Sequence, residues 1–261
     1  MSTRPAGATS WSCSSSTSNA GWRWSPAPIP WSFPVSRPVS SWVAETLAIL
    51  LKEWRGELRT RYALNTVALF AVTTLVVVSI NLGPLGVSRA ALPVLPVVLW
   101  LILLFAASAG LPRSFVHEEE IHTAAALRLA ATPSALYCGK MLYNLSLIYL
   151  LELLVAPLYL MLLELAVAEP VTFVAALAAG GFGLAAGSTL IAAMVAQARI
   201  KATLFAVLAF PVLLPLLVFA VQLTLGAVAG DPKNGLVELL ILYDGTLLVA
   251  GLMLFPVIWN P

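Results

Sequence analysis

Long apolar runs separated by short charged stretches constrain this chain most. Six runs contain at most one Asp, Glu, Lys or Arg each: 62–88, 90–112, 141–163, 170–198, 202–230 and 239–261. About 20 apolar residues in a helix cross the hydrocarbon core of a bilayer, which is about 30 Å thick, so each run is long enough to span a membrane once. A soluble domain carries about a quarter charged residues, whereas this chain carries 10% and is 60% hydrophobic. These proportions exclude a soluble enzyme.

The runs predict six transmembrane helices, near residues 63–82, 92–111, 143–163, 172–195, 204–228 and 239–258. Backbone groups in lipid must be paired within the segment, and the runs lack the alternation of barrel strands, so we expect an all-α membrane protein. All Lys and Arg residues except Arg89 and Lys233 lie before the first span or in the second-to-third and fourth-to-fifth connections. The positive-inside rule therefore places these segments, and both chain ends, in the cytoplasm.

The chain divides into two parts at about residue 41. Residues 1–41 are rich in Ser, Pro and Trp without a period, which predicts a disordered tail, whereas 42–261 would form the membrane domain. Between Trp42 and Arg61, apolar residues recur at steps of three and four with charged residues between them. This pattern predicts an amphipathic helix that lies in the membrane interface and contacts lipid; the alternative is a soluble start of the first span.

The connection between the second and third spans, residues 112–142, is the only long polar insertion between spans. Within it, we expect one charged helix that Pro133 closes, carrying Glu118, Glu119, Glu120 and Arg128. A charged helix presented to the cytoplasm is either a solvated connector or a docking element for a soluble partner that drives motion in the membrane.

Two short segments resemble metal-binding or ATP-binding motifs, but neither matches its motif. His117 and His122 are five residues apart, and at about 100° per residue their side chains diverge around a helix and cannot share a metal. Gly139-Lys140 lacks the other residues of a phosphate-binding loop, which argues against an ATP site of that type. We therefore expect no enzyme activity, no metal site and no directly bound cofactor, and the net charge of +2 gives no indication of a nucleic-acid partner.

Two acidic residues fall inside the expected spans. Glu152 lies near the middle of the third span, and Asp244 lies about one turn into the sixth. An ionised carboxylate at the membrane centre costs at least ~2.5 kcal/mol, so both should face protein or water. They are either a polar lining or intersubunit hydrogen-bonding groups, or interfacial or protonated acids without a function. Gly183 and Gly187 form a GxxxG stripe, which predicts a packing seam within the chain or, alternatively, a homodimer contact.

Four stretches together resemble a known family. They are a charged entry helix, KEWRGELRTRYALN at 52–65; the segment at 113–144 that runs from RSFVHEEE to LRLAATPSALYCGKMLYN; the proline-punctuated FPVLLPLLV at 210–218; and Tyr243-Asp244 at the start of the last span. From about Trp42 onward the chain resembles the CcmB family of haem exporter proteins, which are ABC-transporter permeases of bacterial cytochrome c maturation.

The resemblance implies a six-helix ABC-transporter permease domain in the bacterial inner membrane, with ATP bound by a separate cytoplasmic subunit. The 112–142 connection would dock that subunit as a coupling helix through Arg113, Glu118, Glu119, Glu120 and Arg128. The resemblance also implies two haem partners, a haem-handling membrane protein and a periplasmic haem chaperone, with haem handled by the complex. Two alternatives remain open: the permease of another ABC exporter for a drug, lipid or polysaccharide, and a membrane scaffold that moves nothing.

Overall fold

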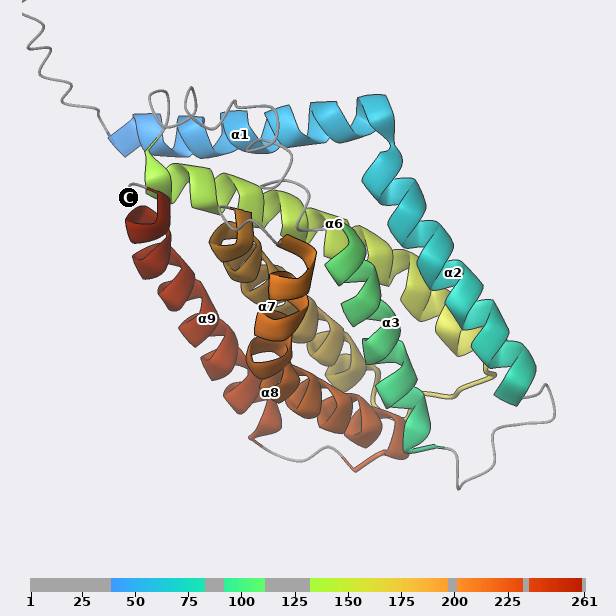
Figure 1. Cartoon of the computed structure of the whole chain (residues 1–261). Helices are drawn as coiled ribbons and strands as arrows, with labels where there is room; N and C mark the ends of the chain where they lie inside the picture. Colours follow the sequence, from blue (N-terminus) through green and yellow to red (C-terminus); the bar gives the residue numbers. More distant parts are fainter. Residues whose placement is uncertain (1–38, 83–91, 111–131, 197–200, 232–234, 260–261) are drawn as a thin grey trace, which may run out of the picture. The chain divides into compact units, whose positions relative to one another are not determined.

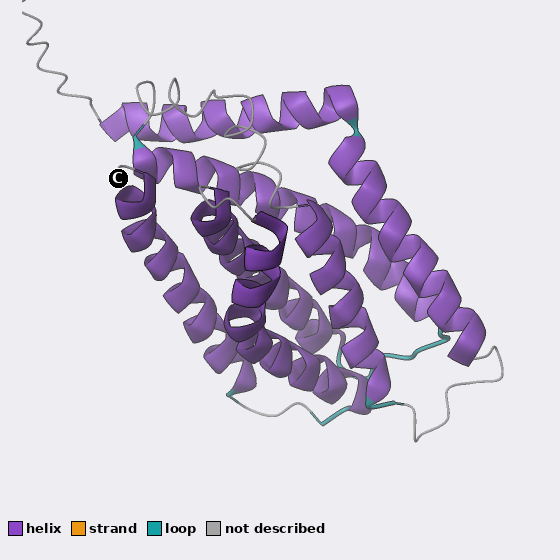
Figure 2. Ribbon diagram, viewed as in Figure 1, coloured by secondary structure: helices purple, strands orange, loops and turns teal. Residues whose placement is uncertain are grey.

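The computed structural model describes residues 39–82, 92–110, 132–196, 201–231 and 235–259, which belong to one compact unit and contain helices joined by short connections (Figures 1 and 2). The helices are α1 (Val39–Thr60), α2 (Tyr62–Leu82), α3 (Val94–Gly110), α6 (Pro133–Leu162), α7 (Pro170–Ala196), α8 (Lys201–Ala229) and α9 (Leu236–Trp259). This part of the chain has no strand, which confirms the all-α prediction. The expected disordered tail lies outside the described residues, except that its last three residues open α1.

Among the described helices, five are long and apolar enough to cross a membrane: α2, α6, α7, α8 and α9. The second expected span corresponds to α3, whose apolar segment Val94–Ser108 is shorter than the other five. A length of 17 residues is near the lower limit for a spanning helix, so the sixth span stays a prediction. Successive helices from α2 to α9 alternate in direction (Figure 1), as expected for a multi-pass membrane protein.

Helix α7 forms the centre of the bundle. It packs against α6, α8 and α9, and more weakly against α3. Its sequence explains this position, because glycines and alanines let neighbouring helices approach its backbone closely. Residues 183–193 of α7 are buried without interruption. By contrast, α2 is peripheral and exposes Leu69 and Ile80 by 69% and 72%.

Helix α1 lies across one end of the bundle and packs along α6 (Figure 1). It ends at Thr60, and Arg61 separates it from α2 with a φ of 52°. Left-handed backbone at a non-glycine residue is uncommon and marks a sharp change of chain direction. The break falls at the predicted end of the amphipathic helix. Its contact with lipid stays a prediction.

The start of α6 differs from the expected third span. We expected Pro133 to close a cytoplasmic helix and the span to begin near residue 143, but Pro133 is instead the first residue of α6. Proline suits this position because the first helical N–H has no partner within the helix. Residues 133–142, including Lys140, are therefore part of α6 and not of the connection.

Candidate functional site

The predicted docking residues of the connection lie outside the described residues: Arg113, Glu118, Glu119, Glu120 and Arg128. The structure does describe the point where this connection enters α6. There, the backbone N–H and the hydroxyl of Thr132 both donate to one carboxylate oxygen of Glu45 on α1, at 3.1 and 3.0 Å. The last residue of the connection is thus attached to α1 as well as to α6.

Further along the same contact, a lysine is enclosed between the two helices. Lys140 of α6 has no exposed side-chain surface, and its Nζ lies 3.3 Å from Oε1 of Glu53 on α1. Glu53 also contacts the exposed Lys52 at 3.4 Å. A buried ammonium group is tolerated only with an opposite charge and hydrogen bonds, so the carboxylate of Glu53 holds Lys140 inside the contact.

Close approach of the helix backbones makes this contact possible. A Cβ atom placed on Gly139 would lie 2.8 Å from Cβ of Ile49 and 3.0 Å from the carbonyl oxygen of Thr46. Two indole N–H groups of α1 also reach α6: Trp42 donates to Ser134 at 3.1 Å and Trp54 to Ser146 at 3.0 Å. We call these contacts between the two helices the α1–α6 seam. It begins at the Trp42–Ser134 pair and ends at the Trp54–Ser146 and Glu57–Tyr143 pairs.

Glu57 extends the α1–α6 seam to a third helix. One of its carboxylate oxygens accepts from the hydroxyl of Tyr143 on α6 at 3.4 Å. The other accepts from the backbone N–H of Leu64, in the first turn of α2, at 2.9 Å. This N–H has no partner within its own helix, so Glu57 fixes the direction in which α2 leaves α1. Glu57 therefore joins α1 to both α6 and α2.

Sequence reasoning missed the acidic residues of the α1–α6 seam, although a signal was present. Glu45, Glu53 and Glu57 recur at steps of eight and four residues, which places them on one face of a helix. That face contacts α6, whereas Leu47 and Leu51 on α1 are about half exposed. Unlike a soluble helix, α1 therefore turns these three acids toward protein and exposes Leu47 and Leu51.

The two acids inside the spans lie beside α7. The side chain of Glu152, on α6, lies against Gly181, and that of Asp244, on α9, lies against Gly183. They are only 6% and 3% exposed, and one carboxylate oxygen of each has no hydrogen-bond partner among the described residues. Both side chains therefore face protein, one of the two surroundings, protein or water, that we expected. Asp244 lies eight residues from the start of α9, about 12 Å along the helix, and so deeper than we expected.

A further polar contact lies near these acids. The indole of Trp100 lies against Gly180, and its N–H donates to Thr224 on α8 at 2.9 Å. Because Gly180, Gly181 and Gly183 span only about 5 Å of α7, Trp100, Glu152 and Asp244 lie at one level of the bundle. We call these three side chains and Thr224 the polar layer. Glycine contacts within the chain confirm the packing seam that we predicted for α7.

The stretches that carried the family resemblance meet in pairs. The entry helix 52–65 contacts 113–144 through Glu53–Lys140 and Glu57–Tyr143. On the other side of the bundle, the hydroxyl of Tyr243 donates to the carbonyl of Val212, within 210–218, at 2.6 Å. These segments, distant in sequence, are therefore the ones that build the α1–α6 seam and the edge of the polar layer.

The site brings together charged and polar groups for helix contact and contains no catalytic arrangement that we recognise. Within the described ranges, no three His, Cys, Asp or Glu residues are grouped so that they could hold a metal ion. What this arrangement can do is hold α1, α2 and α6 together and keep two carboxyl groups inside the helix bundle.

A comparison with curated proteins found no match. Among protein families, the one described as CcmB protein matches residues 44–258, which include the α1–α6 seam and the polar layer. This family comprises membrane permease subunits of an ABC system for haem export in cytochrome c maturation. On the strength of this match over most of its length, the chain belongs to the CcmB protein family.

Proposed function

We propose that this chain is the membrane subunit of an ABC-type complex in the bacterial inner membrane. A partner subunit in the cytoplasm hydrolyses ATP, and the resulting movement drives release of a haem-loaded periplasmic chaperone. Family membership supports the haem-exporter part of this proposal. The coupling part depends on the residues that join the 112–142 connection to the bundle.

The observation that carries the coupling proposal is the α1–α6 seam. Residues 112–132 connect to α6 at Thr132, which Glu45 of α1 holds by two hydrogen bonds. Within the next three helical turns, Lys140 and Tyr143 contact Glu53 and Glu57. A partner that pushes on the connection therefore moves α6 and α1 together, and Glu57 passes this movement to α2.

In this mechanism, Arg113, Glu118, Glu119, Glu120 and Arg128 form the interface with the ATP-binding subunit. Helix α6 carries the movement to Glu152, which lies 19 residues beyond Pro133 on the same helix, about 28 Å away. There the polar layer meets α7 and α9, so a shift of α6 changes the surroundings of both buried carboxyl groups. A haem-handling membrane protein and the periplasmic chaperone respond to that rearrangement. The chain itself binds neither ATP nor a resident cofactor.

Charge reversal of Glu118, Glu119 and Glu120 to Lys tests this proposal. We expect binding of the ATP-binding subunit to weaken by at least about tenfold, since like charges at an interface cost several kcal/mol. ATPase coupling and the content of c-type cytochromes should fall with it. In a matched control, the charges of three exposed acidic residues are reversed. They lie at the end of the bundle opposite to Thr132: Glu164, Glu169 and Glu238.

The results separate the alternatives. A scaffold that moves nothing would keep both ATPase coupling and cytochrome maturation after the reversal, which would contradict the proposal.

Purification of the tagged chain in mild detergent, followed by mass spectrometry, distinguishes a haem exporter from an exporter of another substrate. A bound ATP-binding subunit together with haem-handling proteins supports haem export, whereas an ATP-binding subunit without them indicates another substrate.

A further inference from the structure

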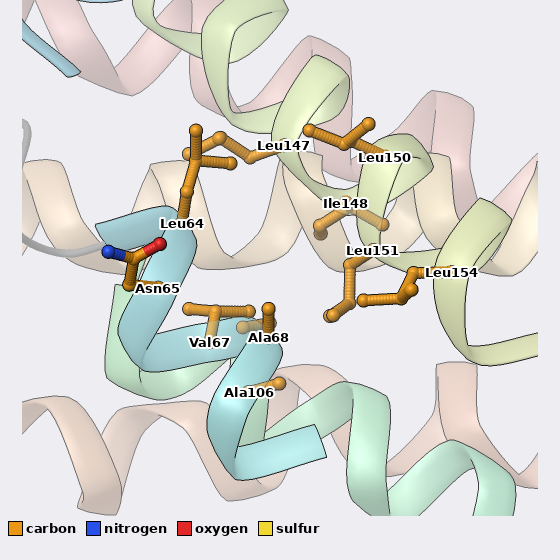
Figure 3. Close-up of a pocket in the computed structure, with 11 residues that line it drawn as sticks. Leu64, Asn65, Val67, Ala68, Ala106, Leu147, Ile148, Leu150, Leu151 and Leu154 are labelled. Carbon is orange, nitrogen blue, oxygen red and sulfur yellow. The ribbon is translucent and has the colours of Figure 1, made fainter. Parts of the chain in front are cut away.

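A cavity of about 310 Å³ lies between α2, α3 and α6, apart from the α1–α6 seam and the polar layer (Figure 3). Leu64 and Ala68 line it from α2, Ala106 from α3, and Ile148 and Leu151 from α6. These side chains carry no polar atom. The interiors of folded proteins are close-packed, so an apolar space of this size is room for a ligand.

The position of the cavity identifies its surroundings. Its lining falls within two candidate spans, Leu64–Asn81 and Pro133–Leu162, and therefore at the depth of the hydrocarbon core. Leu150 and Leu154 line the cavity and are still 44% and 38% exposed. The cavity consequently opens on the surface of the helices, toward lipid and not toward water.

Positive charge is concentrated at the end of the cavity nearest α1. Asn65, the polar residue of the lining, donates its backbone N–H to the carbonyl of Arg61 at 3.1 Å, so Arg61 lies one turn before it. Arg59 and Arg61 are exposed and have no ion-pair partner in the part of the chain that the structure describes. The carboxylate of Glu57, on the same helix as Arg59, already accepts hydrogen bonds from Tyr143 and Leu64.

We propose that this cavity binds one acyl chain of an anionic phospholipid, with the phosphate beside Arg61, Arg59 and Asn65. Basic residues next to a span attract anionic headgroups, and an apolar space at hydrocarbon depth accepts the chain. This inference does not depend on haem or on an ATP-binding subunit.

Native mass spectrometry of the full-length chain in mild detergent tests the proposal, with dioleoylphosphatidylglycerol and dioleoylphosphatidylcholine as probes. We expect one phosphatidylglycerol per chain, bound roughly tenfold more tightly than phosphatidylcholine. Ala68→Phe, which fills the cavity, should abolish binding of both lipids. The control is Leu69→Phe, because Leu69 is the next residue and is 69% exposed on the outer side of α2.

A second pair of variants tests the headgroup. Changing Arg59 and Arg61 together to Gln should reduce phosphatidylglycerol binding to the level of phosphatidylcholine, whereas Arg55→Gln, on the exposed side of α1, should not. If Ala68→Phe destabilises the chain, the smaller Ala68→Leu replaces it. Equal lipid binding by the filled variant and by Leu69→Phe would overturn the proposal. So would a photo-crosslinker at Ala68 that reacts with a second copy of the chain or another protein instead of lipid.

Discussion

The neighbours of Lys140 in the sequence suggest an exposed residue, but the structure buries its side chain. It follows Gly139 in a segment that resembles a loop, yet it lies fully buried in the first three turns of α6. Its amine is held by Glu53, a residue 87 positions earlier in the chain. Truncating one partner of a buried ion pair commonly costs several kcal/mol, because the other charge stays desolvated.

We expect Glu53→Ala and Lys140→Ala each to destabilise the protein, and the double variant to lose less than the sum of the two. The coupling energy should be about 1–3 kcal/mol, since the two groups are in direct contact. Thermal unfolding of the detergent-solubilised chain measures the three variants. The control is Lys52→Ala, because Lys52 contacts the same carboxylate but is half exposed, and its loss should cost under about 1 kcal/mol. Additive effects of Glu53 and Lys140 would show that the pair contributes nothing of its own.

Glu152 is both buried and incompletely hydrogen-bonded, which is costly for a residue that only fills space. We expect Glu152→Leu to fold and to be at least as stable as the original chain, yet to reduce c-type cytochrome content in cells. Glu152→Gln should keep most activity, because it retains a polar group of the same shape. Circular dichroism and a haem stain of membrane proteins give the two readouts. Full activity of the leucine variant would mean that Glu152 has no functional role.

The sequence revealed the charged residues that lie inside apolar runs. It did not reveal the charged residues that pair with a residue distant in the chain. Glu152 and Asp244 stand out because each is the single charge of an apolar run. Lys140, Glu53 and Glu57 do not stand out, since each is an ordinary charge near the end of a predicted span. Only the fold shows that these charges are brought together across more than 80 residues of sequence.

At the scale of helices, the close packing of α1 on α6 depends on one glycine. We expect Gly139→Ala to push the helices apart, because its new Cβ would lie 2.8 Å from Ile49, and to destabilise the protein by about 1–3 kcal/mol. Gly56→Ala is the matched control on α1: nothing lies within 4 Å of its Cβ, and alanine favours helix over glycine. Thermal unfolding should rank Gly56→Ala at or above the original chain. If both variants unfolded at the same temperature, the close approach at Gly139 would contribute nothing to stability.

The apolar runs predicted the number and type of most helices, but not all of their ends. The spans expected at 63–82 and 172–195 differ from α2 and α7 by at most two residues at either end. For α6 the prediction was ten residues too short at its start. Pro133 fits either a position just after a helix or the first turn of one, and the sequence pattern alone does not distinguish them.

For the whole molecule, the orientation in the membrane is directly testable. In a variant with Cys13 and Cys138 replaced, Ala166→Cys lies in the exposed connection between α6 and α7, and Arg59→Cys lies at the end of α1. We expect a membrane-impermeant maleimide to label Ala166→Cys in intact cells freed of the outer membrane. Arg59→Cys should be labelled only after the membrane is permeabilised. The opposite result would place the basic segments outside and contradict the positive-inside assignment.

The contacts between α1 and α6 also have a consequence for biosynthesis. Glu53 is translated 87 residues before Lys140, with two apolar helices between them. At about 5–20 residues per second, α1 waits roughly 4 to 17 seconds for its partner to emerge. During that interval Glu45 and Glu53 cannot yet contact Thr132 and Lys140, while the outward Leu47 and Leu51 can already rest on the bilayer. Insertion of α1 is thus completed only when the beginning of α6 leaves the ribosome, so a chain that stalls before residue 133 presents an unfinished α1 to quality-control proteases.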